Sequence, residues 1–159
     1  MDADAAGQNI ATAQQWFPTL GAIAVEANTT YEMDGQLVTT RTAGVTSHTT
    51  GLIFAGTGTL IGIQYEVQVN SGDDESVIAQ NRTISRTAAN TTVKGASTSA
   101  TESVSIFLEG IVRINAAGTF IPQFIYSATP GGAPTIRANS YFQLRKRGSG
   151  TLTAIGTWT

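Results

Sequence analysis

Regular alternation of apolar and polar residues is the feature that most constrains how this chain can fold. In a β-strand, successive side chains point to opposite faces, so a period of two predicts a strand with one buried face. No window of the chain keeps the spacing of three and four residues that an amphipathic helix needs. The clearest alternating sets are Ile61, Ile63, Tyr65, Val67 and Val69, and further along Val104, Ile106, Leu108, Val112 and Ile114.

Turn residues divide the C-terminal third of the chain into three predicted strands. The second alternating set ends at residues 115–118, Asn-Ala-Ala-Gly, where glycine permits a positive φ, and alternation resumes with Phe120, Phe124 and Tyr126. Two strands joined by a short turn that contains glycine are typical of a β-hairpin. Residues 130–134, Pro-Gly-Gly-Ala-Pro, cannot continue a strand ladder, and the strand pattern returns in a third strand at residues 141–144.

The rest of the chain predicts further strands and loops, and together they indicate the fold class. About eight to ten short strands without a helix predict an all-β fold, a two-sheet antiparallel sandwich of jelly-roll type. Residues 1–20 are expected to form an extended N-terminal arm and residues 21–159 the sandwich domain. The local predictions are a hairpin at Asp34-Gly35, an exposed strand at 76–86 with Ile84, a surface loop at 90–100, and a last strand at 151–159 through Leu152 and Ile155 or Trp158.

Composition excludes several classes of function. Charged residues make up 13% of the chain and its net charge is −2, so no overall field attracts nucleic acid or an anionic membrane. The absence of cysteine excludes disulfides, thiolate catalysis and zinc sites built on sulfur. The N-terminus lacks the regions of a secretory signal, and no apolar run is long enough to span a bilayer. Abundant Thr and Ser favour outer faces that a neighbour can cover at low cost, as in an assembly component.

Few residues are candidates for catalysis or for binding a metal or a charged partner. His48 is the only histidine and lies in a polar stretch that predicts a loop, so we expect a surface or hydrogen-bonded histidine without a catalytic role. His48→Ala is then expected to leave folding and assembly unchanged. Residues 73–75 lack the alternate spacing of a calcium loop and predict a solvated turn. The basic residues 145–147 are either a solvated strand edge or a contact for an acidic patch on a partner. We therefore expect no enzyme, no catalytic residue, no metal and no cofactor.

Two segments near the C-terminus carry a family resemblance. The chain reads GTFIPQF at residues 118–124 and, after a Pro/Gly loop, ANSYFQL at residues 138–144. This pair resembles the C-terminal half of small structural proteins of tailed bacteriophages, in which a GTFxPQF strand precedes a GSY/F strand. Similar domains occur among capsid decoration or cement proteins and tail-fibre modules, which implies a compact jelly roll of the C1q/TNF type. Asn139 stands where glycine is frequent, and asparagine tolerates the same left-handed turn.

The resemblance implies a virion structural protein. We expect a capsid decoration or cement protein that binds the outer capsid surface of the virion and stabilises it by bridging capsid subunits. Its expected partners are the major capsid protein and further copies of this chain. A tail-fibre or receptor-binding module with an adhesion function is the alternative, although the chain lacks a long repetitive shaft. A glycan-binding module also stays open, because Trp16 and Trp158 are available to stack on sugars.

Two sets of apolar residues have no place in the predicted core. Trp16, Phe17 and Pro18 lie in a segment without periodicity, and they either dock on the capsid or an adjacent subunit, or fold back onto their own domain. We expect docking, so that a chain starting at Leu20 keeps its β fold and loses capsid binding. The second set has the parity opposite to the core and predicts a homo-oligomer, a trimer first and a dimer next, through Phe107, Ile111, Ile121 and Ile125.

Overall fold

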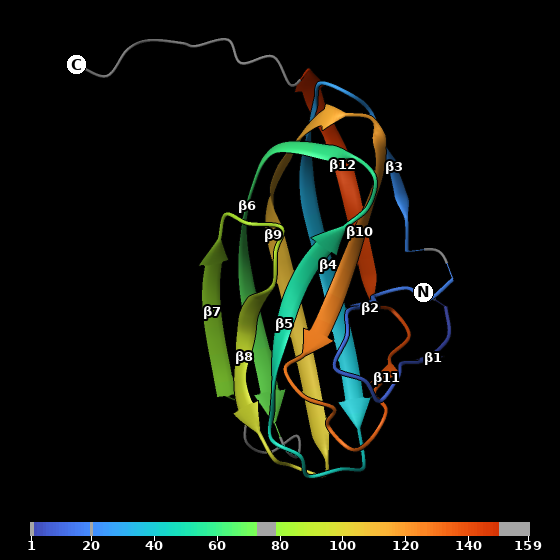
Figure 1. Cartoon of the computed structure of the whole chain (residues 1–159), viewed down its shortest axis with the longest axis vertical. Coiled ribbons are helices and arrows are strands. Elements are labelled where there is room, and N and C mark those ends of the chain that lie inside the picture. Colours follow the sequence, from blue (N-terminus) through green and yellow to red (C-terminus); the bar gives the residue numbers. More distant parts are fainter. Residues whose placement is uncertain (1, 20, 73–78, 150–159) are drawn as a thin grey trace, which may run out of the picture.

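The protein is an all-β sandwich of two antiparallel sheets, as predicted (Figure 1). The computed structural model describes residues 2–19, 21–72 and 79–149. The chain changes sheet at each step from β4 to β6 and again from β8 to β10, as strands do in jelly rolls. The strands are β1 (Ala5–Ala6), β2 (Gln14–Gln15), β3 (Ile23–Val25), β4 (Thr29–Arg41), β5 (His48–Ala55), β6 (Thr59–Gly72), β7 (Ala79–Ser85), β8 (Thr91–Ser97), β9 (Glu102–Ala116), β10 (Gly118–Tyr126), β11 (Thr135–Ile136) and β12 (Tyr141–Ser149).

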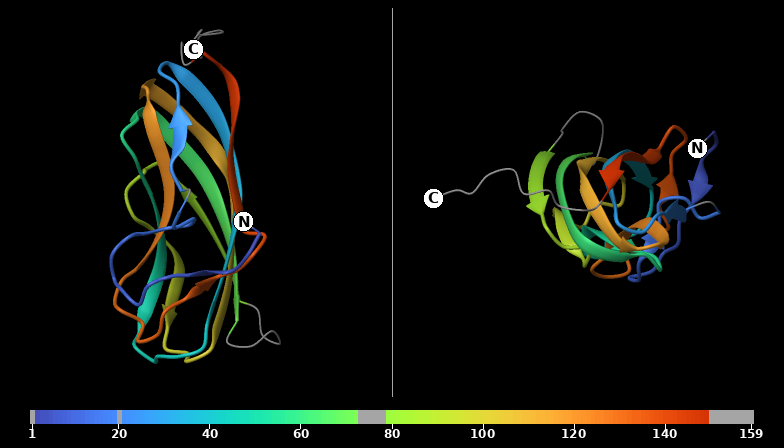
Figure 2. Two further views of the ribbon diagram at one scale, coloured as in Figure 1. Left: turned by 90° about the vertical axis from the view of Figure 1, so that its right-hand side faces the viewer. Right: turned by 90° about the horizontal axis from the view of Figure 1, so that it is seen from above.

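Each sheet has a simple order. The seven-stranded sheet runs β1-β11-β4-β9-β6-β7, with β12 also paired to β4. The five-stranded sheet runs β2-β10-β5-β8, with β3 also paired to β10. In Figure 1, β5, β8 and β10 lie in front of β4, β6 and β9, and the view from above in Figure 2 shows both sheets curving round a shared interior.

The alternating positions of the sequence form the core between the sheets. Every large apolar residue of the predicted set on β9 is buried, and so are the three aromatic residues Phe120, Phe124 and Tyr126 of β10. On β6 the prediction holds from Ile63 to Val69, but Ile61 is 46% exposed. The cause is a shift of register between Leu60 and Gly62, a β-bulge that turns the strand.

Three local predictions were wrong. The strands on either side of residues 115–118 form no hairpin, because β9 and β10 belong to different sheets. Asp34-Gly35 forms no hairpin, because it lies in the middle of β4, which pairs with β9 without interruption from Thr29 to Arg41. Gly35 also lacks the positive φ that the tight hairpin turn requires. Residues 90–100 are not a surface loop: β8 pairs with β5 and buries Val93 and Lys94. The predicted last strand at 151–159 lies outside the described residues.

Two turn predictions have different outcomes. Asn139 has a φ of 68°, which confirms the left-handed turn expected at this position. Gly118 does not have a positive φ. It needs glycine for another reason, since a Cβ there would lie 2.4 Å from the backbone nitrogen of Gly58. Close approach of the connection between β5 and β6 therefore selects glycine at the start of β10.

The N-terminal segment is extended and lies along one edge of the sandwich. Its short strands join both sheets, β1 through Ile136 of β11 and β2 through Phe124 of β10. Trp16 follows β2 and is completely buried, with its ring edge-on to Phe142 at a centroid distance of 5.7 Å. The segment thus contributes a large side chain to the core that residues 21–149 build.

Candidate functional site

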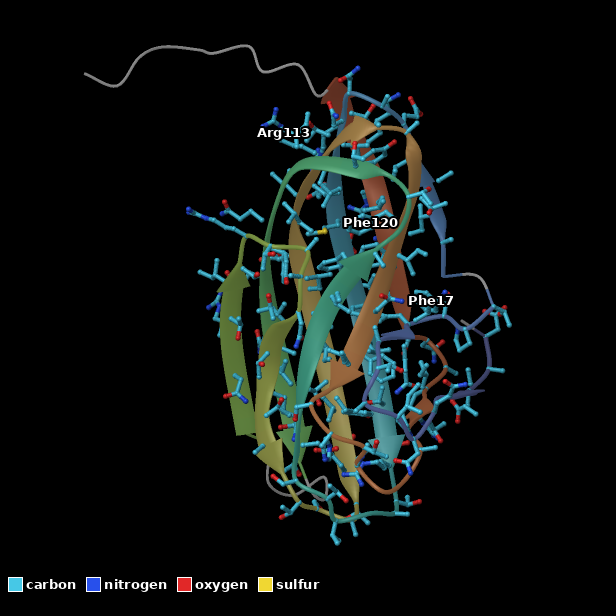
Figure 3. All side chains as sticks on the ribbon, viewed as in Figure 1. Phe17, Arg113 and Phe120 are labelled. Atoms are coloured by element: carbon cyan, nitrogen blue, oxygen red, sulfur yellow. The ribbon has the colours of Figure 1, made fainter. Side chains whose placement is uncertain are left out.

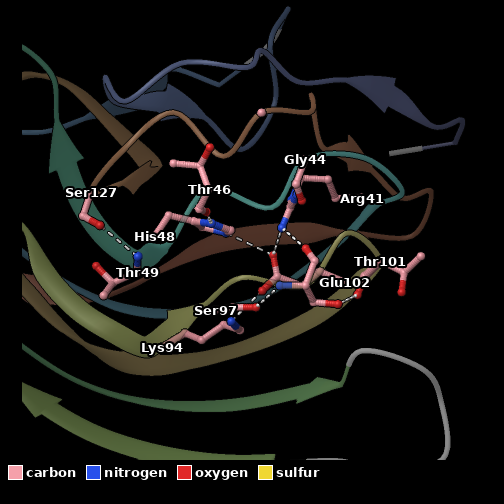
Figure 4. A network of polar contacts seen from close by, with 12 residues as sticks. Arg41, Gly44, Thr46, His48, Thr49, Lys94, Ser97, Thr101, Glu102 and Ser127 are labelled. Atoms are coloured by element: carbon pink, nitrogen blue, oxygen red, sulfur yellow. Dashed lines mark hydrogen bonds and ion pairs between the residues drawn. The ribbon is translucent and has the colours of Figure 1, made fainter.

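A buried cluster of charged side chains lies at one end of the sandwich (Figure 4). At its centre is the carboxylate of Glu102, the first residue of β9. Lys94 Nζ lies 2.5 Å from Oε1, and Arg41 Nη2 lies 3.2 Å from Oε2. Arg41 also donates to the carbonyl oxygens of Ala43, Gly44 and Ser99. One carboxylate therefore connects the end of β4, the middle of β8 and the start of β9.

His48 is part of this cluster, which corrects the expectation of a loop histidine. It is the first residue of β5 and only 1% exposed. Nδ1 lies 2.8 Å from the carbonyl oxygen of Thr46, and Nε2 lies 3.2 Å from Oε2 of Glu102. Both ring nitrogens are thus held by oxygen atoms of the protein, and neither is open to a substrate or a metal ion.

The charges in the cluster shift the pKa values of Glu102 and Tyr126. Burial alone would raise the pKa of Glu102, but the hydrogen bond and charge of Lys94, with the charges of His48 and Arg41, hold that pKa below its ordinary value. Burial, and then the charge of Glu102, raise the pKa of Tyr126 well above its usual range. Tyr126 packs edge-on against the His48 ring at 5.0 Å and stays neutral at physiological pH.

This cluster is enclosed by the fold. Arg41, His48, Lys94 and Glu102 are each at most 6% exposed, so a substrate cannot reach them. Within the described part of the chain, no group of three or more His, Asp or Glu side chains is suited to hold a metal ion. No described helix could cross a membrane. Removing one member of a buried ion cluster leaves the remaining charges uncompensated, which is strongly destabilising.

The outer face of the seven-stranded sheet is the second candidate, and it is accessible. Six large apolar side chains of the described residues are markedly exposed. Four of them belong to this face, at 39% to 69% exposure: Ile84 of β7, Phe107 and Ile111 of β9, and Tyr141 of β12. Ile61 stands at the bulge of β6, and Val45 lies on the connection between β4 and β5. Exposed apolar groups of this kind are typical of interaction surfaces.

Strand registers place the charges of this outer face in rows. Asp34, Glu109 and Glu66 stand side by side on β4, β9 and β6. Like charges in such positions repel one another. Asp34 accepts a hydrogen bond from Gln143, and Glu66 pairs with Arg82. Glu109, in the centre, forms no ion pair within 4.0 Å among the described residues, but its charge acts on the guanidinium of Arg82.

Two shallow hollows lie on the outer face. The larger, of about 700 Å³, is lined by Ile84, Ile111 and Arg113 together with Glu32, Glu109 and Arg147. The smaller, of about 440 Å³, lies between Phe107 and Tyr141. Arg113 projects near the upper end of the sandwich in Figure 3. Both hollows are open and mixed in polarity, as expected of a surface that binds a macromolecule.

The structure separates the four residues predicted to form the oligomer interface. Phe107 and Ile111 lie on the outer face of the seven-stranded sheet, whereas Ile121 and Ile125 are half-buried on β10 of the opposite sheet. Sequence reasoning missed Ile84 and Tyr141 as members of the first group. Strand parity could have indicated that Tyr141 points away from the core, since it alternates with Phe142, but not that it joins this group.

The three residues at the end of the predicted arm, Trp16, Phe17 and Pro18, lie in different environments. Trp16 is enclosed by its own domain, so the second of the two expectations, folding back, describes this side chain. Phe17 is half-buried against the core, and Pro18 is exposed. Phe17 lies at the edge of the sandwich (Figure 3). The buried Trp16 offers no ring to a sugar, and Trp158 lies outside the described residues.

The basic residues 145–147 also have partners within the chain. Arg145 lies 3.8 Å from Asp34, Lys146 lies 2.6 Å from Glu26, and Arg147 pairs with Glu32. These ion pairs connect β12 to β4 and the residue that follows β3. The acidic residues 73 and 74, and Glu75, lie outside the described residues.

Comparison with known proteins identifies no relative. No protein-family model matches the chain, and neither a curated protein nor a solved structure matches it significantly. The geometry of the outer face and of the buried cluster thus stands beside the sequence resemblance as the basis for assigning a function.

Proposed function

We propose that this protein is a virion structural protein that decorates a bacteriophage capsid, binds its outer surface and stabilises it by bridging capsid subunits. The observation that carries this role is the group of four exposed apolar side chains on the outer face of the seven-stranded sheet. A protein that works alone gains nothing from exposing them, whereas a component of an assembly buries them against a neighbour. The kind of assembly, a phage capsid, is proposed from the two C-terminal segments that resemble phage structural proteins.

Binding, and not catalysis, is the chemistry that this chain supports. The one histidine is enclosed and uses both ring nitrogens in hydrogen bonds. The open face carries carboxylates, amides and guanidinium groups beside aliphatic side chains, a mixed polarity that suits a protein interface. Full burial of each apolar side chain contributes roughly 1.5–3 kcal/mol.

The test is binding to capsids that lack the protein. Purified protein is mixed with undecorated capsids, and the bound fraction and the thermal stability of the capsids are measured. We expect saturable binding and a higher capsid melting temperature. Ile111→Ser should weaken binding, while Val45→Ser, which removes another exposed apolar side chain away from this face, should not. Absence of binding by the wild-type protein would contradict the proposed function.

A further inference from the structure

The outer face of the seven-stranded sheet has an arrangement that is complementary to itself. Outward positions along β9 read Phe107, Glu109, Ile111, Arg113, so an acid and a base stand at equal distances on either side of Ile111. Two sheets can pack face to face about 10 Å apart. If β9 packs antiparallel on β9 of a second copy with Ile111 on Ile111, each Glu109 faces an Arg113.

The row of Ile111 contains Glu32, whose charge is balanced by Arg147 of the same chain, and the rows on either side of it differ in charge and height. Glu109 is flanked across the sheet by Asp34 and Glu66, so its row carries three acidic side chains. Arg113 is flanked by Thr30 and Gly62, and nothing lies within 4 Å of the position a Cβ of Gly62 would occupy. The acidic side chains of one copy would thus face Arg113 of the other copy, where the small residues Thr30 and Gly62 leave room for them.

From this self-complementarity we infer that the outer face of the seven-stranded sheet is the interface of a homodimer with two-fold symmetry. The two-fold axis lies between the sheets, perpendicular to β9 and level with Ile111. Each contact then occurs twice, as a two-fold interface requires. The dimer gives Glu109, which interacts with Arg82 of its own chain only through its charge, a direct ion pair, and it covers Ile111.

The dimer rests on the proposed role in an assembly and makes it more specific. A dimer presents two equivalent copies of every other surface, so it can contact two capsid subunits at once. That is the geometry that bridging requires. Linked binding of two sites also raises the overall affinity without any new contact.

The test uses charge exchange and needs no capsid. Sedimentation of the wild-type full chain at micromolar concentrations should give a dimer. Glu109→Arg alone and Arg113→Glu alone place like charges opposite each other, and each variant should dimerise at least about tenfold more weakly.

An equimolar mixture of the two variants restores both ion pairs. The arginine introduced in one chain faces the glutamate introduced in the other, and the native Arg113 of the first chain faces the native Glu109 of the second. The mixture should therefore form heterodimers as readily as the wild type forms homodimers.

Several outcomes would overturn the dimer. A wild-type protein that is monomeric at high micromolar concentration, or trimeric, contradicts it, and so does a mixture that stays monomeric while each variant retains its fold by circular dichroism. If the monomeric wild type still binds undecorated capsids and both variants bind them less well, the outer face contacts the capsid protein directly. The dimer then fails while the proposed function stands. Failure of the proposed function is separate, since it appears as a dimer that binds no capsid.

Discussion

Gly35 and Trp16 lie in direct contact: a Cβ on Gly35 would stand 3.1 Å from Cζ3 of the Trp16 ring. The same Cβ would lie 2.9 Å from Cδ2 of Phe142 and from the carbonyl oxygen of Tyr141. The glycine in the middle of β4 therefore leaves room for an aromatic ring that the N-terminal segment brings to the core. This contact links three distant parts of the sequence.

Gly35→Ala should destabilise the protein by about 1–3 kcal/mol, because overpacking forces neighbouring side chains or backbone to shift. Gly95→Ala is the matched control on another strand, where nothing lies within 4 Å of the position a Cβ would occupy. It should change the free energy of unfolding by no more than about 0.5 kcal/mol or raise it slightly. Urea denaturation measures both. Equal effects at the two positions would contradict the close contact at Gly35.

Trp16→Ala should lower the free energy of unfolding by about 3–5 kcal/mol, as deletion of a buried large aromatic side chain does. Trp16→Phe should cost about 1.5 kcal/mol or less, because Trp16 Nε1 has no hydrogen-bond partner among the described residues and its removal leaves no group unsatisfied. Exposed Thr19→Ala is the control. If Trp16→Ala is as stable as the wild type, the ring is not a core residue.

Truncation of the chain before Leu20 should therefore reduce stability as well as any docking by Phe17 and Pro18. The truncated chain loses Trp16 together with the pairings of β1 and β2. Its melting temperature, followed by circular dichroism, should fall below that of the full chain. An unchanged melting temperature would show that residues 1–19 do not stabilise the sandwich domain.

Glu102→Gln should lower stability at neutral pH by about 3–5 kcal/mol, because the buried cations Arg41 and Lys94 lose their counter-charge. The folded state lowers the pKa of Glu102, so its contribution is present above the ordinary value of 4.5 and is lost as the pH falls toward the lower folded-state pKa. The stability difference between wild type and variant should thus shrink between pH 7 and pH 3. Glu26→Gln, in an exposed ion pair, is the control. A difference that does not depend on pH would show that Glu102 is not held ionised.

His48→Ala should destabilise the protein by about 1–3 kcal/mol, since it leaves buried acceptors without their donors. It also removes the ring that packs against Tyr126. For a chain of this size the melting temperature should fall by roughly 2–4 °C for each kcal/mol. At temperatures where the variant is folded, binding to capsids should equal that of the wild type, because His48 is only 1% exposed and has no surface to offer a capsid protein. A stable variant that no longer binds would indicate a direct role for His48.

Strand parity made the core and the fold class predictable. The apolar set of β9 and the aromatic set of β10 are buried as expected, because alternation depends only on local backbone geometry. The same parity indicated that Phe107 and Ile111 face outward. Their grouping with Ile84 and Tyr141 was not predictable, since it depends on which strands become neighbours across the sheet.

Long-range pairing explains what sequence reasoning missed. Asp34-Gly35 satisfies the local preference for a hairpin, but thirteen residue pairs with β9 hold β4 straight. His48 stands among polar residues that suggest a loop, yet Glu102 lies 54 positions away in sequence and brings it into a buried ion cluster. In both cases partners distant in sequence outweigh the local signal.

The central claim is that this protein is a structural component of a capsid surface, and its copy number in purified particles tests that claim most directly. Quantitative mass spectrometry of intact virions gives the ratio of this chain to the major capsid protein. Capsid decoration predicts a copy number comparable to that of the major capsid protein. Absence from the particles, or only the few copies expected of a fibre tip, would contradict it.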